Sequence, residues 1–279
     1  MNYQTSVIEL IKTRKSVRTY EDKKIDTNSL QTLKKFISEI NKQSKIKARY
    51  VIADNADTKK GTAVKLGTYG VISGADMFIV GIIDKDEKDT AEFGYQFEKI
   101  ILCATDLGLS TCWLGGTFNK GSFERSVELG DNEIIPIVSP VGYGKGKRKL
   151  LESAMRSLAG SDQRKPWSEI FFNKDSSIAL SESDAGNYAL TLEMTRLAPS
   201  ASNKQPWRVI MAHNRFDFYL ARTPGYGSLT FDLQKNDVGI AMCHFELSAL
   251  ELGLKGNWKT YGSIETNANW EYVSTWEIE

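Results

Sequence analysis

The sequence predicts an α+β fold that consists of two divergent copies of one structural unit. Segments with helical periodicity alternate with short apolar segments typical of strands along the 279 residues. Two long helical segments, which contain Gly94 and Gly239 near their starts, are similar to each other in sequence. A chain of this length is long enough to bury a sizeable core.

Helices are expected where apolar residues recur every three or four positions. Thr27 and Asn28 are candidate N-caps of the second helix, because their side-chain oxygens can accept hydrogen bonds from free amides at a helix start. Gly108 suits the end of the third helix, because glycine readily adopts the left-handed conformation that terminates helices. The predicted helices are 6–15, 27–42, 89–108, 185–197 and 233–256.

Strands are expected where short apolar segments lie between polar or glycine-containing turns. The segments 48–54 and 75–84 are rich in valine and isoleucine, and the segment 216–222 is rich in aromatic residues. The predicted strands are 48–54, 75–84, 111–116, 133–144, 206–212, 216–222 and 270–278.

The repeat is supported by residues that recur at one constant spacing. Gly94 corresponds to Gly239, and five later residues (Ala104, Leu107, Gly108, Leu109 and Trp113) recur 145 positions on as Ala249, Leu252, Gly253, Leu254 and Trp258. A second pair of similar segments, "NKQS" at 41–44 and "NKQP" at 203–206, is separated by 162 positions. A chance likeness between helix–glycine–strand units is the alternative. We predict a first half at 1–172 and a second half at 173–279.

Composition excludes some classes of protein. With 36 Lys and Arg against 35 Asp and Glu, the chain has no global charge that would attract nucleic acid or an anionic membrane. No apolar run reaches membrane-spanning length, and the first residues lack the apolar core of a signal peptide. The glycines and lysines of "VGYGKGKRK", at 141–149, do not match a phosphate-binding P-loop, and a solvated basic loop is favoured there.

The cysteines and histidines give no sign of a disulfide framework or a metal site. The three cysteines, Cys103, Cys112 and Cys243, are widely spaced, which favours a reducing cytoplasm. Only two histidines, His213 and His244, are present, and for His244 and Cys243 a core or surface role is favoured over metal ligation. No metal is expected.

The segment "TRKSVRTY", at 13–20, is the first candidate for chemistry. Arg14, Ser16 and Arg18 alternate, so an extended backbone places their side chains on one face. Two guanidinium groups and a hydroxyl between them suit a phosphate group. From composition alone, the favoured alternative is a solvated basic end of the first helix.

The segment "LAPSASNKQPWRVI", at 197–210, is the second candidate. Its small residues allow the backbone to approach a flat ligand, while Ser200, Asn203 and Gln205 can form hydrogen bonds to it. The equally supported alternative is an ordinary proline-bounded turn before a core strand, with Trp207 as a packing residue.

Together these segments resemble the nitroreductase family of FMN-dependent oxidoreductases. The segments "TRKSVRTY", "APSASNKQPWRV", "LGLSTCWLGG" and "VGYG" are similar to four signature regions of that family, and "QRKPW", at 163–167, is similar to its late basic segment. The first two motifs are specific, and the glycine–tryptophan region is weaker. The resemblance implies a three-layer α/β/α nitroreductase-like fold and a hydride transfer from NADH or NADPH through FMN to a nitroaromatic, quinone or similar acceptor.

The resemblance also implies the residues that bind the cofactor. Arg18 and Lys204 are candidates for electrostatic support of the reduced flavin. The segment "GTYGVISGAD", at 67–76, has no clear match to a polar contact that the family makes there. The predicted cofactor-binding residues are Arg14, Lys15, Ser16, Arg18, Gly115, Gly116, Arg164, Pro199, Ser200, Asn203 and Gln205.

The distribution of the motifs departs from the usual family pattern. A usual member carries both specific motifs about thirty residues apart and forms a homodimer with two flavin sites. Here the motifs lie in different halves, and the equivalent segments, "SSIAL" at 176–180 and "ISEINKQ" at 37–43, have lost the arginines and the proline. We therefore predict a tandem-fused variant that resembles the TM-type nitroreductases, with one FMN site between the halves, in a monomeric chain.

Two other functions remain open at this point. One is a different flavin reaction on the same scaffold, such as reductive dehalogenation. The other is an FMN-binding or sensor protein without turnover. The sequence does not distinguish NADH from NADPH.

Overall fold

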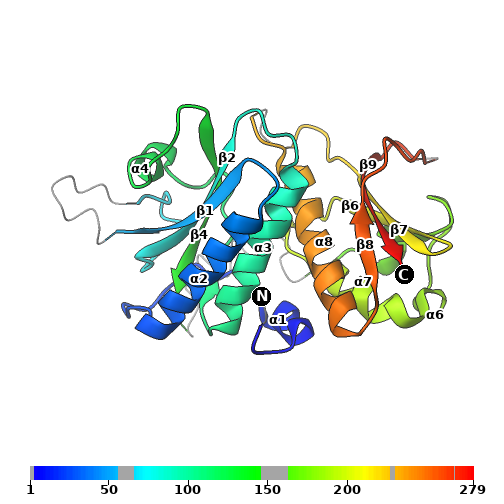
Figure 1. Cartoon of the computed structure of the whole chain (residues 1–279), viewed down its shortest axis with the longest axis horizontal. Coiled ribbons are helices and arrows are strands. Elements are labelled where there is room, and N and C mark those ends of the chain that lie inside the picture. Colours follow the sequence, from blue (N-terminus) through cyan, green and yellow to red (C-terminus); the bar gives the residue numbers. More distant parts are fainter. Residues whose placement is uncertain (1–2, 56–65, 146–162, 227–229, 267) are drawn as a thin grey trace. The chain divides into compact units, whose positions relative to one another are not determined.

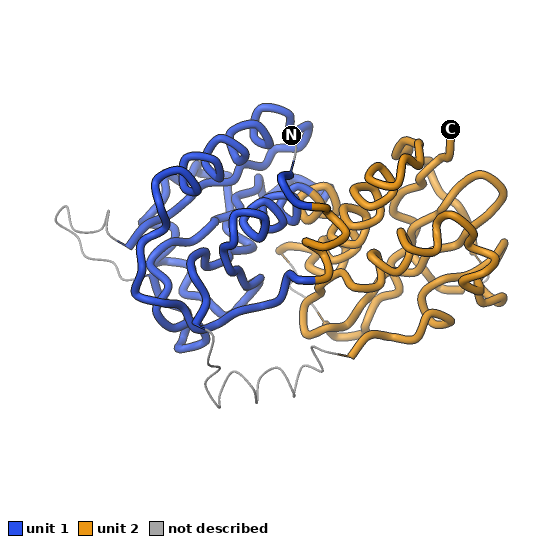
Figure 2. The backbone as a smooth tube through the Cα atoms, turned by 90° about the horizontal axis from the view of Figure 1, so that it is seen from below, with its two compact units in different colours: residues 1–5, 13–89, 96–158 blue, residues 6–12, 90–95, 159–279 orange. Residues whose placement is uncertain are grey.

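The structure is a computed structural model that describes residues 3–55, 66–145, 163–226, 230–266 and 268–279 (Figure 1). The chain divides into two compact units, which Figure 2 shows in different colours. Unit 1 comprises residues 1–5, 13–89 and 96–158, and unit 2 comprises residues 6–12, 90–95 and 159–279. Each unit contains its own sheet, so the predicted α+β class is confirmed.

Unit 1 is built on a four-stranded antiparallel sheet with the strand order β1-β2-β4-β3. Its elements are α2 (Thr27–Gln43), β1 (Ala48–Asp54), β2 (Met77–Asp84), most of α3 (Thr90–Asp106), β3 (Ser110–Thr111), α4 (Lys120–Glu124) and β4 (Glu133–Gly142). Tyr50 of β1 joins the layers on one face of the sheet: its carbonyl accepts from Asn41 of α2, and its hydroxyl donates to Gln96 of α3. The opposite face has its own apolar core around Phe78, Val80 and Phe123.

Unit 2 is built on a five-stranded sheet with the order β5-β6-β7-β9-β8, in which only β5 and β6 are parallel. Its strands are β5 (Phe171–Asn173), β6 (Trp207–Ala212), β7 (Arg215–Leu220), β8 (Gly256–Lys259) and β9 (Glu271–Ile278). Its helices are α1 (Val7–Thr13), α6 (Glu182–Ala185), α7 (Ala189–Arg196) and α8 (Leu233–Glu251), with short 3-10 turns η2 (Trp167–Glu169), η3 (Gly186–Tyr188) and η4 (Ala201–Asn203). An aromatic cluster around Phe245 of α8 fills the core; it includes Tyr188, Phe216, Phe218, Trp258 and Trp276. Within the described ranges, every helix is too short or too polar to cross a membrane.

The two units share one order of elements. Apart from α4, which lies between β3 and β4, the series α2-β1-β2-α3-β3-β4 corresponds to α7-β6-β7-α8-β8-β9. The strand order β1-β2-β4-β3 corresponds to β6-β7-β9-β8. Gly108 and Gly253, which are 145 residues apart, follow the long helices with φ values of +71° and +73°. These correspondences favour the predicted repeat, whose boundary at residue 172 stays a prediction.

The starts of the two long helices make a reciprocal close contact within unit 2. A Cβ atom on Gly239 of α8 would collide with the carbonyl oxygen of Ala91 in α3, and one on Gly94 would collide with that of Asn236. Ala91 and Asn236 are also 145 positions apart, so each partner of the first contact has its counterpart in the second. The contact therefore has the same 145-residue spacing as the similar helical segments.

Several predicted boundaries were wrong. The N-cap of α2 is Asp26, not Thr27 or Asn28, because the Asp26 carboxylate accepts from the Ser29 amide at 3.0 Å. The predicted strand 111–116 is reduced to β3, since Gly115 and Gly116 lie in bends. The helix predicted over 233–256 ends at Glu251, and β5, β8, α4 and α6 were not predicted. Residues 146–149 of the glycine- and lysine-rich loop lie outside the described residues.

Candidate functional site

The arginine-containing segment of unit 1 has an extended backbone beside β3. Ser16 forms a parallel bridge with Thr111, and the amide of Val17 donates to the carbonyl oxygen of Thr111 at 2.9 Å. An extended backbone places alternate side chains on one face, so this pairing agrees with the predicted arrangement of Arg14, Ser16 and Arg18.

Arg14 and Arg18 both bury guanidinium nitrogens that have no hydrogen-bond acceptor among the described residues. The nitrogens are Nε and Nη1 of each side chain. A buried cationic donor without an acceptor is costly, because water that bound it in the unfolded chain is lost without replacement. Two such groups on alternate positions of one segment therefore fit an anionic ligand, and their planar donors match the oxygens of a phosphate group.

A buried carboxylate lies behind Arg14. Glu98 of α3 is fully buried, and its Oε1 lies 3.9 Å from Arg14 Nε, an ion-pair distance that is too long for a hydrogen bond. Its Oε2 accepts a hydrogen bond of 2.9 Å from Trp113 Nε1. The equivalent Trp258 donates in the same way to Glu246 of α8, one helical turn further along. Glu98 thus connects the arginine segment to the glycine–tryptophan region.

The proline-containing segment of unit 2 has a strained backbone. Ser202, Asn203 and Gln205 have φ values of 47°, 54° and 49°, in the left-handed region that residues with a Cβ atom seldom adopt. Three such residues in four positions persist only where surrounding contacts impose the conformation, and strain of this kind is concentrated at ligand-binding sites. The predicted proline-bounded turn is therefore a constrained loop, which we call the 200–205 loop.

The side chains of the 200–205 loop bind the segment 163–165. Asn203 Oδ1 accepts from Arg164 Nη1 at 3.0 Å, and Asn203 Nδ2 donates to the Gln163 carbonyl at 2.7 Å. Gln205 is buried, and its Oε1 accepts from the Lys165 amide at 2.8 Å. The structure thus brings Arg164, Asn203 and Gln205 together, as neighbours that stabilise one loop. This structural role was not predicted from the sequence.

Positive charge is concentrated beside this loop. Burial lowers the pKa of Lys165, and the nearby cations Arg208 and Lys204 lower it further, against the opposing effect of Glu169. Burial also lowers the pKa of Arg208. Cations that are brought together against their repulsion favour an anionic ligand nearby.

The other predicted site residues differ in exposure. Lys15, Lys204, Gly115 and Gly116 are exposed, while Pro199 and Ser200 are half-buried. A Cβ atom on Gly116 would meet no atom within 4 Å, so its backbone is open to a ligand. The Ser200 hydroxyl oxygen accepts from the Gln205 amide at 2.9 Å and closes the 200–205 loop.

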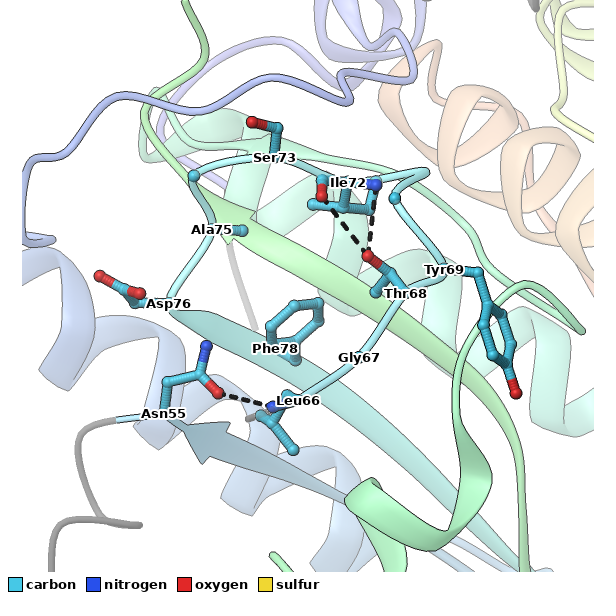
Figure 3. A pocket seen from close by; sticks show the side chains of 12 residues that line it. Asn55, Leu66, Gly67, Thr68, Tyr69, Ile72, Ser73, Ala75, Asp76 and Phe78 are labelled. Atoms are coloured by element: carbon cyan, nitrogen blue, oxygen red, sulfur yellow. Dashed lines mark hydrogen bonds between the residues drawn. The ribbon is translucent and has the colours of Figure 1, made fainter. Parts of the chain in front are cut away.

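A pocket of about 430 Å³ lies in unit 1 (Figure 3). Phe78 and Leu66 contribute apolar surface, and Thr68, whose hydroxyl accepts from the Ile72 amide at 3.2 Å, stabilises the wall. The amide of Ser73 in this wall donates to the Arg18 carbonyl at 2.9 Å. The pocket is formed largely by the segment 67–76, for which the sequence indicated no ligand contact.

A model of the family described as "Putative TM nitroreductase" matches residues 6–249 of the chain. The chain belongs to this family. The match covers most of the sequence, including all of the predicted site residues, and it supports a general flavin oxidoreductase. No curated protein matches the sequence.

Solved structures show that this nitroreductase has the fold of a known relative. A putative nitroreductase from Thermotoga maritima is 18% identical and aligns over 100% of this chain and 95% of its own, with a TM-score of 0.60. A nitroreductase family protein from Clostridium novyi is 23% identical over 51% of this chain and 87% of its own, with a TM-score of 0.41. An FMN-dependent nitroreductase from Clostridium difficile is 21% identical over 51% and 90% of the two chains, with a TM-score of 0.39.

The three cysteines and one of the two histidines of this nitroreductase are buried, while His213 is exposed. Cys103, Cys112 and Cys243 are buried thiols that form no disulfide among the described residues, and burial raises the pKa of the Cys103 thiol to about 12. His244 is buried, and its Nδ1 lies 3.1 Å from the Met194 carbonyl oxygen.

Sequence reasoning missed two carboxyl groups that support the candidate residues. Glu98 lies behind Arg14, and Asp237 of α8 accepts from the Ala201 amide in the 200–205 loop at 3.0 Å. Both are acidic residues within largely apolar helical segments, "YQFEKIIL" and "NDVGIAM". An isolated acid in such a segment is the signal that could have identified them, because charged residues are seldom fully buried without a specific partner.

Proposed function

We propose that this chain is an FMN-dependent oxidoreductase that passes hydride from NADH or NADPH to a nitroaromatic, quinone or similar acceptor. Membership of the nitroreductase family supports the flavin chemistry. The observation that carries the cofactor assignment is that Arg14 and Arg18 each bury two guanidinium nitrogens, Nε and Nη1, without an acceptor among the described residues. FMN, when bound, supplies the hydride chemistry, and the protein residues bind it and stabilise its charge.

The residues of unit 1 are proposed to bind the FMN phosphate. Arg14 would donate charge-assisted hydrogen bonds to its oxygens, with Ser16 as a neutral donor and Lys15 close by. The open backbone at Gly115 and Gly116 would allow the edge of the flavin ring to approach.

The residues of the second motif are proposed to contact the same FMN. Because Asn203 and Gln205 already bond the segment 163–165, their contribution is to maintain the shape of the 200–205 loop, while Pro199 and Ser200 contact the flavin. Arg164 would provide a further cation for the phosphate, and Lys204 and Arg18 would stabilise the negative charge of the reduced flavin. Each half retains the motif that the other has lost, which favours one FMN per chain.

An absorbance spectrum of the purified protein tests the proposal. We expect a yellow protein with one FMN per chain, which NADH or NADPH bleaches under nitrogen. A colourless protein that FMN does not reconstitute would contradict the cofactor assignment, and a value of two FMN per chain would contradict the single site. Bound FMN that neither nicotinamide reduces would identify a binding or sensor protein without turnover. A cytoplasmic location stays a prediction from the cysteine pattern.

Glu98→Gln is expected to weaken FMN binding by roughly threefold to tenfold. Glutamine still accepts from Trp113, but it removes the negative charge beside Arg14 and so leaves the guanidinium less fixed. FMN titration by fluorescence quenching measures the effect. The matched control is Glu246→Gln, because Glu246 also accepts from a tryptophan indole but lies in unit 2. An equal loss of FMN affinity in the two variants would contradict a specific role for Glu98.

The protein is expected to be a monomer of about 31.3 kDa with its flavin bound. The reciprocal contact of Gly94 and Gly239, of the kind that two subunits make at a twofold axis, is formed here within one chain. Light scattering across a tenfold dilution measures the mass. A stable dimer that releases flavin as it dissociates would show that the site is shared between chains.

A further inference from the structure

Asp237 is a buried carboxyl group that has no basic partner among the described residues. Only 2% of the surface of this residue is exposed, and the residue lies in the second turn of α8. Its Oδ2 accepts from the Ala201 amide at 3.0 Å, while burial raises its pKa well above the usual range. An apolar residue would avoid the cost of burying this group, so its hydrogen bond to the loop requires an explanation.

The hydrogen bond of Asp237 ties the 200–205 loop to a rigid helix. Ala201 precedes the residues with positive φ, and Ser200 Oγ holds the other end of the loop through the Gln205 amide. A residue with a Cβ atom is strained in the left-handed region, so this loop needs external contacts to keep one conformation. Asp237 supplies the contact at its start.

The same end of α8 also holds a neighbouring loop. Gln234 Oε1 accepts from the Thr223 amide at 2.7 Å, and the hydroxyl of Tyr226, three residues later, donates to Ser202 Oγ at 2.8 Å. The first turns of α8 therefore reach the 200–205 loop by two routes, directly through Asp237 and indirectly through Tyr226. Both routes fix the position of the loop relative to one helix.

We infer that Asp237 is a positioning residue that holds the 200–205 loop in its strained, FMN-competent conformation through the Ala201 amide. This inference rests on the proposed function. Asp237 itself does not contact the cofactor in this role; it determines how well the loop is preorganised, and preorganisation increases affinity because less order has to be imposed on binding.

Two substitutions remove the hydrogen bond from opposite sides. Asp237→Ala removes the acceptor, and Ala201→Pro removes the donor. Proline is compatible with this position, because Ala201 is the first residue of η4 and Ser200 before it is extended, with φ −147° and ψ 159°. Asp237→Asn keeps an acceptor oxygen. Asp217→Asn is the matched control, since Asp217 is equally buried in unit 2 but is bonded by Thr275 and Arg215.

Hydrogen–deuterium exchange of the amides of residues 202–205 and FMN titration provide independent measurements. We expect Asp237→Ala and Ala201→Pro each to accelerate exchange in the loop and to weaken FMN binding about tenfold, and the double variant to weaken it no further. Asp237→Asn should stay within about threefold of the parent protein, as should Asp217→Asn.

The two measurements separate the inference from the proposed function. Unchanged amide exchange of residues 202–205 in both single variants would overturn the inference. A double variant whose loss of FMN affinity equals the sum of the two single losses, in free energy, would also overturn it. Faster exchange with unchanged FMN affinity would overturn the link between the loop and the flavin. A parent protein that binds no FMN would refute the proposed function, while exchange would still decide whether Asp237 positions the loop. If Asp237→Ala does not fold, Ala201→Pro decides the question.

Discussion

Gly239→Ala is expected to destabilise the protein by about 1–3 kcal/mol, the usual cost of overpacking a well-packed core. The sign is the informative part, because alanine in place of a helical glycine ordinarily stabilises a helix by about 1 kcal/mol. At Gly239 the added methyl group would collide with the carbonyl oxygen of Ala91, a backbone atom that can move only if α3 moves. Thermal unfolding measures the change, at about 2–4 °C per kcal/mol for a chain of this size.

Gly121→Ala is the matched control for this prediction. Gly121 lies in α4, where a Cβ atom would meet only flexible side-chain ends, Arg125 Nη1 at 3.4 Å and Asn119 Oδ1 at 3.7 Å. This variant should be as stable as the parent protein or more so. Gly94→Ala should resemble Gly239→Ala, because it meets the reciprocal backbone contact at Asn236. A stable Gly239→Ala variant would contradict the close crossing of the two helices.

The elements that the sequence predicted well are those with a strong internal pattern. The strand 48–54 was predicted with its observed bounds, because its apolar residues stand between polar turns. The predicted start of α2, at Thr27, is the observed one, but its N-cap was placed on Thr27 or Asn28. Three consecutive residues, Asp26, Thr27 and Asn28, can all cap a helix, and only the backbone geometry selects Asp26. β5 was missed for a different reason: its three residues pair in parallel with β6, far along the chain, and a short segment carries no pattern for such a partner.

The candidate site was predictable to the extent that its residues are close in sequence. The alternation of Arg14, Ser16 and Arg18 can be read from the short segment 13–20. The extended backbone that places these side chains on one face is present in the structure. Glu98 and Asp237 were missed because each acts across a long interval of sequence, and their helices were read as core segments. The hydrogen bonds of Asn203 and Gln205 to the segment 163–165 were missed. The sequence alone does not show whether a side-chain amide binds a ligand or another part of the protein.

Arg14→Ala and Arg18→Ala are each expected to weaken FMN binding by about tenfold to a hundredfold. A charge-assisted hydrogen bond contributes about 1.5–3 kcal/mol, and 1.4 kcal/mol corresponds to a factor of ten in affinity. The two variants should differ in stability without FMN. Arg14→Ala removes the cation that lies 3.9 Å from the buried Glu98 carboxylate, so this variant should unfold more easily. Arg18→Ala removes buried donors that lack acceptors among the described residues and should be as stable as the parent protein.

FMN titration and thermal unfolding of the flavin-free protein, measured on the same variants, test this prediction. Lost affinity without lost stability in Arg18→Ala is the combination expected of a ligand-binding residue, because a purely structural residue would affect both. Arg14→Lys should recover only part of the affinity, since lysine keeps the charge but lacks the planar pair of donors. Arg49→Ala is the control, because Arg49 forms a partly exposed ion pair with Glu133 in the same unit. This substitution should leave the affinity for FMN unchanged. An unchanged dissociation constant in both Arg14→Ala and Arg18→Ala would show that the segment 13–20 is a basic helix end and not a phosphate site.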